Sequence, residues 1–342
     1  MRTHIARKCS LAFATRLQSV ETVVLAVFVA LGVAASAPAA IIRVNAATDV
    51  DIQQAINALP ASGGTIEVSA DAPVAVSQSI VIARDNVTID FGGATLKLKD
   101  GANAPVVIMG ESVAVPTTTH TNIQIRNVVI DGNRGKQNSE TNPGNPALRN
   151  NGISMRKVFK SQVENAIIYS CRSGGLVTEL GCQRLVIQNI DSYSNHFDGM
   201  AVYMTQDSIF KGLKLHDNGA AGFSADIVFN RNVVSDCVVS GNPHCGIFMR
   251  NSRDNVFESL EIRNNGEHGI FLAQVDQDIT KPAAGNTFLG CVISNSTGAG
   301  IRVNDVSCVN NMLSSSQLIG NTGGGISEPF EGLLQVFAVI VR

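Results

Sequence analysis

Apolar residues recur at a fixed spacing along most of the chain, in short stretches separated by Asn and Gly. From residue 152 onward a glycine returns every 23 to 25 residues, apart from one step of 31, and an apolar residue follows each of the first seven. These glycines are Gly152, Gly175, Gly199, Gly222, Gly246, Gly269, Gly300 and Gly325. A column made mostly of Asn precedes them by four residues and includes Asn195, Asn218, Asn242 and Asn265.

Each repeat is too short to enclose a core of its own, but stacked repeats would bury one continuous apolar column per strand. One such column contains Ile125, Val163, Ile187, Phe210, Val234, Phe257, Phe288 and Leu313. The short unit, with period-2 strands and Asn or Gly turns, predicts an all-β fold, a right-handed parallel β-helix of about ten turns. A leucine-rich repeat is the alternative solenoid, and its L-x-x-L-x-L signature is missing. We expect the Asn column to turn inward and to be structural, because it recurs at every turn.

Both ends of the repeat array carry weaker patterns. Residues 41–63 predict an N-terminal cap, with a short amphipathic helix that opens at Asp49 or Asp51 and ends at Pro60. Strand-like segments at 79–83, 87–90 and 94–98 predict the first, irregular turns. The apolar tail 333–341 predicts a last strand. No linker separates these parts, so residues 40–342 are interpreted as one domain.

The start of the chain has the pattern of a secretory signal peptide. A positive stretch from Arg2 to Arg16 precedes an apolar run from Thr22 to Ala35, and small residues at an A-x-A spacing follow at 37–39. A single membrane anchor is the alternative, but the run of fourteen is shorter than the roughly 20 residues that a span needs. We therefore expect residues 1–39 to be a signal peptide, the mature chain to lack a membrane span, and the protein to be secreted or periplasmic.

The amino-acid composition indicates what kind of fold and which binding partners the protein can have. Only 16% of residues are charged, whereas Gly (31) and Asn (29) are abundant, which favours many short elements joined by turns. Residues 40–342 carry a net charge of −5, so nothing attracts nucleic acid or an anionic membrane surface. The six cysteines beyond residue 39 show no zinc spacing and no C-x-x-C pair. We expect Cys237 and Cys291 to be small buried apolar residues, two turns apart.

The candidate chemistry lies on one outer face. In the strand after each glycine, the second and fourth side chains should point away from the core, and successive strands lie about 4.8 Å apart. Tyr203, Asp226 and Arg250 should therefore be successive neighbours, and they are our candidate catalytic residues. Glu179 and Arg156 should continue this column below them. Ordinary pairing of opposite charges on neighbouring strands is the alternative explanation.

Further polar residues border this face and are candidate substrate-binding residues. The longest insert, residues 134–151, is expected to form a groove wall, from which Lys136, Arg134 and Arg149 could reach over the groove. Three histidines stand one to three residues before a repeat glycine. The complete candidate binding set is Lys136, Arg156, Glu179, His196, Asp198, His244 and His268.

Four segments between Val128 and Asn265 resemble the β-helical modules of mannuronan C5-epimerases and related alginate and pectate lyases. The matching segments are Ile130–Arg134 with Lys136, Phe197–Met200, Gly222–Asp226 and the turn Asn242–Gly246. The resemblance implies a strand face that binds a linear uronan, a cation that neutralises the C5 carboxylate, and removal of the C5 proton with help from a Tyr or His. The match of Gly222–Asp226 to the family's Gly-Phe-x-Ala-Asp implies a site role for Asp226.

One strand departs from that family. The family's strand Tyr-Gly-Phe-Asp-Pro-His corresponds here to Asp198-Gly199-Met200-Ala201-Val202-Tyr203. Ala201 stands in place of the family's Asp, and Tyr203 stands in place of its His. Two functions from different classes therefore stay open: a uronate-polysaccharide lyase or C5-epimerase, and a non-catalytic glycan-binding or structural β-helix protein. Hydrolysis of the polygalacturonase type is disfavoured, because Ala220 and Ala221 stand where those enzymes have their paired catalytic acids.

For the enzyme, we expect Tyr203 to be the base, with a pKa lowered by neighbouring cations, and Arg250 to hold the substrate carboxylate. The expected partner in either case is an acidic polysaccharide such as alginate or pectate. No cofactor is identified. Calcium is left open, because Glu179, Asp198 and Asp226 are too few to define a calcium cage.

Overall fold

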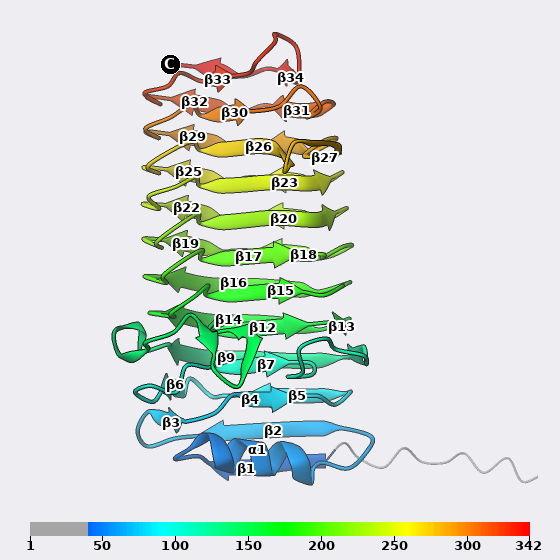
Figure 1. Ribbon diagram of the computed structural model, residues 1–342, viewed down its shortest axis with the longest axis vertical. Helices are drawn as coiled ribbons and strands as arrows, with labels where there is room; N and C mark the ends of the chain where they lie inside the picture. The colour runs from blue at the N-terminus through cyan, green and yellow to red at the C-terminus, as the bar shows by residue number, and fades with distance from the viewer. Residues whose placement is uncertain (1–39) are drawn as a thin grey trace, which may run out of the picture. The chain divides into compact units, whose positions relative to one another are not determined.

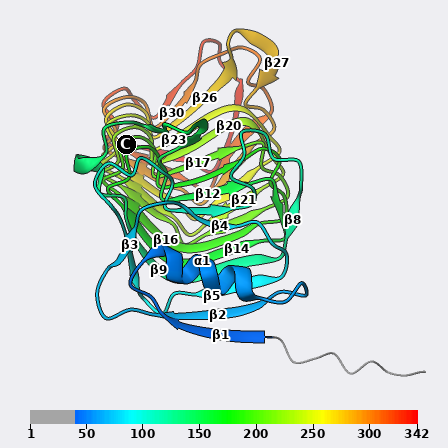
Figure 2. The same cartoon turned by 60° about the horizontal axis from the view of Figure 1, so that its bottom comes forward.

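The computed structural model describes residues 40–342, whose strands stack in parallel into a solenoid (Figures 1 and 2). Each turn of the chain returns to a strand directly above the previous one, so that a residue pairs with its counterpart one repeat later. The predicted all-β solenoid with a short N-terminal helix is confirmed.

Three columns of strands make up the solenoid. The first column contains β1 (Ala40–Asn45), β2 (Gly64–Ser69), β5 (Val87–Asp90), β9 (Ile123–Asp131), β14 (Gln162–Tyr169), β16 (Val186–Tyr193), β18 (Ile209–Lys211), β21 (Val233–Ser235), β24 (Val256–Glu258), β28 (Thr287–Leu289), β31 (Asn311–Ser314) and β34 (Leu334–Phe337). The long strands β9, β14 and β16 also continue into the second column. Its other members are β3 (Val74–Val76), β6 (Thr95–Leu98), β19 (Lys214–His216), β22 (Val238–Ser240), β25 (Glu261–Arg263), β29 (Val292–Ser294), β32 (Gln317–Ile319) and β35 (Ile340–Val341).

The third column forms a separate sheet, which carries the candidate site. It contains β4 (Ile80–Ile82), β7 (Val107–Met109), β12 (Ile153–Arg156), β15 (Leu176–Glu179), β17 (Met200–Tyr203), β20 (Phe223–Asn230), β23 (Ile247–Arg253), β26 (Ile270–Val275), β30 (Ile301–Val303) and β33 (Ile326–Ser327). Short pairs lie at its margins, namely β8 (His120–Thr121) with β13 (Val158–Phe159), β10 (Thr141–Asn142) with β11 (Asn145–Arg149), and β27 (Asp278–Pro282) with β26. With twelve strands in the first column, the stack has slightly more turns than the ten or so that we expected.

The core consists of the apolar columns that the repeat predicted. Phe210 pairs with Val234, and Val234 pairs with Phe257, so the predicted column is stacked in register. All three side chains are buried. The first and third side chains of the site-bearing strands also face this core, because side chains alternate along a strand.

The helix α1 (Asp49–Ala58) covers the N-terminal end of this core. It begins after Thr48, whose backbone N–H donates to Asp51 Oδ2 at 2.8 Å. Ile52 and Ile56 point inward and are buried, as the amphipathic pattern predicted. At the other end, the apolar tail forms two short strands, β34 and β35, instead of one.

The Asn column turns inward and forms a ladder of side-chain hydrogen bonds. The Asn195 amide donates to Asn218 at 2.9 Å, Asn218 to Asn242 at 3.2 Å, and Asn242 to Asn265 at 3.1 Å. This confirms the structural role predicted for the column. A second ladder, which we did not predict, runs through Asn232, Asn255, Asn286 and Asn311.

Replacing Asn218 by Ala is expected to lower stability without changing the candidate site. The substitution removes hydrogen bonds to Asn195, Asn242 and the Ser192 carbonyl, each of which contributes about 0.5–1.5 kcal/mol. Thermal unfolding measures the effect, with the exposed Asn57→Ala as the matched control. Loss of function at unchanged melting temperature would show that the ladder is more than structural.

Two further sequence predictions concern the start of the chain and its cysteines. The proposed signal peptide, residues 1–39, lies outside the described residues. Within residues 40–342, no helix is both long enough and apolar enough to cross a bilayer. The six cysteines of this region are free and buried, and burial raises the pKa of Cys237 to about 12 and that of Cys291 to about 11. Cys237 and Cys291 are therefore the small buried residues that the sequence predicted.

Candidate functional site

The predicted outer row exists in the predicted order. Tyr203 pairs with Asp226, and Asp226 pairs with Arg250, on the neighbouring strands β17, β20 and β23. Arg156 and Glu179 pair in the same way on β12 and β15. The register of the repeat therefore places these five side chains on one face.

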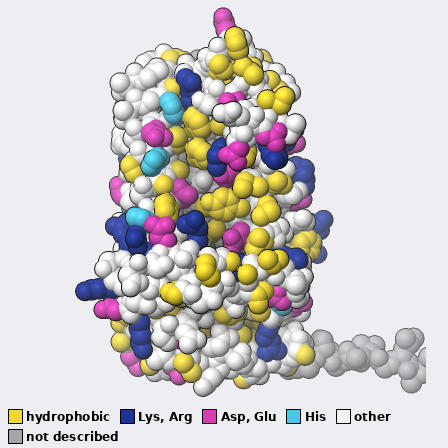
Figure 3. Space-filling view, in the orientation of Figure 1, with side chains coloured by type: hydrophobic (Ala, Val, Ile, Leu, Met, Phe, Trp, Pro, Cys, Tyr) yellow, Lys and Arg dark blue, Asp and Glu magenta, His cyan; other side chains and the backbone are white. Residues whose placement is uncertain are grey.

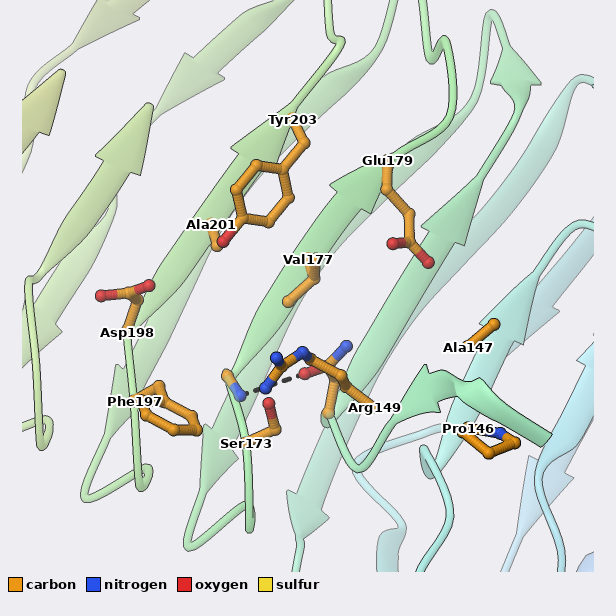
Figure 4. Close-up of a pocket in the computed structure, with 12 residues that line it drawn as sticks. Pro146, Ala147, Arg149, Ser173, Val177, Glu179, Phe197, Asp198, Ala201 and Tyr203 are labelled. Atoms are coloured by element: carbon orange, nitrogen blue, oxygen red, sulfur yellow. Dashed lines mark hydrogen bonds between the residues drawn. The ribbon is translucent and has the colours of Figure 1, made fainter. Parts of the chain in front are cut away.

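A cavity of about 590 Å³ opens on this face beside Tyr203 (Figure 4). Its floor is made by the small outward side chains Val177 and Ala201, and the strand β11 of the long insert closes one side. The complete lining is Pro146, Ala147, Arg149, Asn151, Ser173, Gly174, Val177, Glu179, Phe197, Asp198, Ala201 and Tyr203. The predicted groove wall is thus the β10–β11 hairpin.

Arg149 is the cation that the insert brings to the cavity. Its guanidinium carbon lies 5.9 Å from the centre of the Phe197 ring, and its nearest carboxylate, Glu140, is 3.8 Å away. Lys136 and Arg134 lie instead in the 3-10 turn η1 (Arg134–Lys136) and do not line the cavity. The expectation that Lys136 reaches over the groove is therefore not met, because hydrogen bonds hold η1 against residues 98–101.

Asp198 is a carboxyl group whose pKa is strongly raised by its surroundings. It immediately precedes the repeat glycine before β17, and its Oδ1 accepts a hydrogen bond from the Ala221 N–H at 2.9 Å. Burial raises its pKa to about 6, with a further increase from Asp226 that the Ala221 N–H and His244 oppose. Near neutral pH this group can both take up and release a proton.

Tyr203 is surrounded by negative charge and is partly buried. Burial raises its pKa to about 12, and Asp198 and Asp226 add to this shift while Arg149 opposes it. This corrects our expectation that cations would lower the pKa, because burial and the neighbouring carboxylates outweigh the effect of Arg149. The Tyr203 phenol is therefore protonated at neutral pH and can donate a proton but not accept one.

Asp226 and Arg250 form a close ion pair above the cavity. Asp226 is nearly fully buried, and its Oδ1 has no hydrogen-bond partner, while Nε of Arg250 is also buried without one. The Arg250 guanidinium carbon lies 5.2 Å from the centre of the Phe248 ring. Because these contacts hold Arg250, it is less available than Arg149 for a substrate carboxylate.

Arg156 is a structural residue. Its guanidinium donates to the carbonyl oxygens of Glu111, Val113 and Ala114 at 2.6–3.1 Å and to Glu179 at 2.8 Å. It is only 1% exposed, so the expectation that it binds substrate is contradicted. The segment that covers it, residues 111–114, lies outside the repeat. Glu179 lines the cavity, and burial raises its pKa.

The three histidines border the face without lining the cavity. His196 lies 3.3 Å from Glu140, and His244 lies 3.4 Å from Glu267. Nδ1 of His268 accepts the Ala299 N–H at 3.0 Å, and burial lowers the pKa of this ring. Sequence reasoning left Phe197, Ser173 and Asn151 out of the candidates, because they sit in turns whose direction the strand periodicity does not predict.

The described residues offer no ready metal site. Within 40–342, no group of three or more His, Cys, Asp or Glu side chains is arranged to hold an ion. The side chains on this face supply a cation at Arg149, a carboxyl group at Asp198 and a protonated phenol at Tyr203.

Comparison with known protein families identifies the family to which the chain belongs. The sequence profile described as "right handed beta helix region" matches residues 115–249 and 215–328, and the chain belongs to this family. No curated protein sequence matches it.

Solved structures share the fold at low sequence identity. The A-module of mannuronan C-5 epimerase AlgE4 from Azotobacter vinelandii has a TM-score of 0.63 and 16% identity, covering 87% of this chain and 92% of that one. ORF18 of Geobacillus virus E2 has a TM-score of 0.59 and 14% identity, covering 85% of this chain and 56% of that one. The periplasmic alginate epimerase AlgG has a TM-score of 0.52 and 13% identity, covering 87% of this chain and 83% of that one. The predicted resemblance to the epimerase β-helices is confirmed as a likeness of fold.

Proposed function

We propose that this member of the right-handed β-helix family binds an acidic, uronate-containing polysaccharide in the cavity and removes the C5 proton of one sugar, as a lyase or a C5-epimerase. The observation that carries the proposal is that one cavity is lined by a cation, a carboxyl group with a pKa of about 6 and a protonated phenol. The likeness of fold to two alginate epimerases supports the choice of substrate class.

Arg149 supplies the charge that the reaction needs. The C5 proton of a uronate is weakly acidic, because its removal adds negative charge next to a carboxylate. A guanidinium binds a carboxylate through two parallel hydrogen bonds and stabilises that charge. Arg149 is 57% exposed and only loosely paired with Glu140, so its fork is free to turn toward a bound sugar.

Asp198 and Tyr203 divide the proton transfers. The ionised Asp198 carboxylate takes the C5 proton, and the electron pair moves onto the substrate carboxyl group. In a lyase, this pair then forms the C4–C5 double bond, and the leaving glycosidic oxygen receives the Tyr203 proton. In an epimerase, Tyr203 returns a proton to C5 from the opposite face. In both cases the two side chains exchange their protonation states with solvent before the next turnover.

Activity is expected to rise as pH increases through about 6, because only ionised Asp198 can act as the base and its pKa lies there. The same shift predicts the opposite trend in stability. A carboxyl group whose pKa is raised on folding contributes stability below its unfolded pKa, and this contribution is lost as pH rises through the folded value. A kcat/KM profile measures the first effect. A flat profile between pH values on either side of about 6 would remove Asp198 from the role of base.

Replacing Tyr203 by Phe is expected to lower turnover by at least about a hundredfold, the lower end of what a general acid contributes. The ring and its packing remain, so the melting temperature should change little. The measurement is steady-state kinetics on a polysaccharide that the unaltered protein converts. The matched control is Tyr169→Phe, which changes a Tyr on the second column of strands, away from the cavity. Full activity of the variant would place the proton donor elsewhere.

A non-catalytic glycan-binding protein is the second candidate, and one residue favours it. Ala201 stands on the cavity floor where the resembling epimerase family has an Asp. Such a protein would use the same cavity and the same Arg149 but would leave the polymer unchanged.

Incubation with alginate and with pectate separates these functions. A lyase produces an unsaturated uronate, which is followed by its ultraviolet absorbance, whereas epimerisation gives no chromophore and is followed by proton NMR. Binding without either change supports the second candidate. Neither binding nor turnover by the folded protein would contradict both. We also propose that the protein meets this polymer outside the cytoplasm, as the pattern of residues 1–39 suggests.

A further inference from the structure

The cavity is closed on the side of the N-terminal turns. Pro146 and Ala147 of the β10–β11 hairpin line it there. On the other side of the hairpin, Asn142 and Leu148 line a separate cavity of about 370 Å³ over β4 and β7. The hairpin therefore stands across the sheet face and divides two hollows that would otherwise form one groove.

The strand beneath this barrier is also covered. The outward side chains of β12, Ser154 and Arg156, are each 1% exposed. Arg156 is held by the carbonyl groups of residues 111–114. Figure 1 shows chain segments in front of β12, and Figure 3 shows the corresponding loops bulging over the lower part of this face. A linear polymer lying in the cavity cannot continue in this direction.

The face is open toward the C-terminal turns. In Figure 1 no segment lies in front of β17 and β20, and the β26–β27 hairpin stands at the C-terminal ends of β23 and β26. Phe248 and Phe271 are partly exposed, and their rings are stacked with centres 5.4 Å apart and planes 10° from parallel. Rings stacked along the solenoid axis turn their edges outward, and ring edges carry the partial positive charge that favours oxygen atoms.

A cation continues this row. Arg302 pairs in register with Phe271 on the next strand. Its guanidinium donates to the Ser327 hydroxyl at 2.6 Å and, among residues 40–342, it forms no ion pair. Successive strands are about 4.8 Å apart, which is roughly the length of one sugar residue in an extended polymer. The row from Ala201 to Arg302 is thus long enough to contact several successive sugars. At its far end, Arg302 can bind a carboxylate of the polymer.

We propose that the cavity is a blind cleft that holds the end of a polysaccharide chain, and that the rest of the chain leaves over Phe248, Phe271 and Arg302. The protein then acts at, or binds to, chain ends and not chain interiors. This inference rests on the proposed function for its ligand, an acidic polysaccharide, but not on the occurrence of catalysis.

Binding to oligomannuronates and oligogalacturonates of defined length tests the inference, with each oligomer coupled to a surface through one end or through the other. The expected result is that coupling through one end abolishes binding and coupling through the other preserves it. In solution, one protein molecule should bind per polymer chain, whatever the chain length. Binding through both couplings, with a stoichiometry that grows with chain length, would overturn the blind cleft and leave the proposed function standing. No binding of any acidic oligomer by the folded protein would overturn both.

A variant at the open end gives an independent test. Phe248→Ala should lose affinity for long oligomers while keeping the affinity for the shortest oligomer that binds, because only long chains reach β23. The control is Phe330→Ala, which changes a Phe that is 66% exposed outside this row. Equal loss for short and long oligomers would contradict the proposed direction of the chain.

Discussion

Replacing Asp198 by Asn is expected to lower turnover on the acidic polysaccharide by about two to four orders of magnitude, the range that a general base contributes. The amide keeps the size of the side chain and can still accept the Ala221 N–H, but it cannot take up the C5 proton. Substrate binding through Arg149 should survive, so the effect should appear in kcat more than in KM.

The same variant separates a catalytic from a structural role. Burial disfavours the ionised Asp198 carboxylate, so above pH of about 6 the neutral amide should leave stability unchanged or raise it. Asp254→Asn, which alters an exposed Asp in the turn between β23 and β24, is the matched control. A variant that unfolds more readily at neutral pH, or one that keeps full activity, would contradict the assignment of Asp198 as the base.

Replacing Phe223 by Ala is expected to lower the free energy of unfolding by about 3–5 kcal/mol, the cost typical of a buried Phe. Phe223 is the first inward residue of β20 and is 1% exposed. Its ring packs against Phe210, Phe229 and Phe257, with centres 5.7–6.4 Å apart. The cavity left by its removal cannot collapse easily, because strands above and below fix the spacing of the turns.

Denaturant unfolding measures this loss, with the exposed Phe330→Ala as the control, which should change stability by less than about 0.5 kcal/mol. Since contacts in a solenoid join only neighbouring turns, a break of the stack near β20 would also lower the cooperativity of the transition. A loss for Phe223→Ala no larger than that of the control would show that the aromatic cluster does not hold the central turns together.

The repeat made the fold predictable because each turn reuses the same positions. Phe210, Val234 and Phe257 had to stack once the spacing was known, and the pairing of Tyr203, Asp226 and Arg250 followed from the same register. The inward Asn ladder followed as well, since a residue that recurs at every turn serves the stack and not a single site.

The site itself was less predictable, because segments outside the repeat shape it. Nothing in the strand pattern tells that residues 111–114 fold over Arg156, or that the insert brings Arg149 instead of Lys136 to the cavity. The protonation of Tyr203 depends on its burial and on the neighbouring acids Asp198 and Asp226. A pKa shift of this kind depends on how deeply a side chain is buried, and the spacing of residues along the sequence does not give that depth.

Proton NMR of alginate and pectate incubated in deuterated water tests the central claim, removal of a C5 proton in this cavity, most directly. With the unaltered protein, and not with Asp198→Asn, the C5 proton signal is expected to be lost through exchange with deuterium, or an olefinic H4 signal is expected to appear. Spectra that stay unchanged with the folded, unaltered protein on both polymers would contradict it.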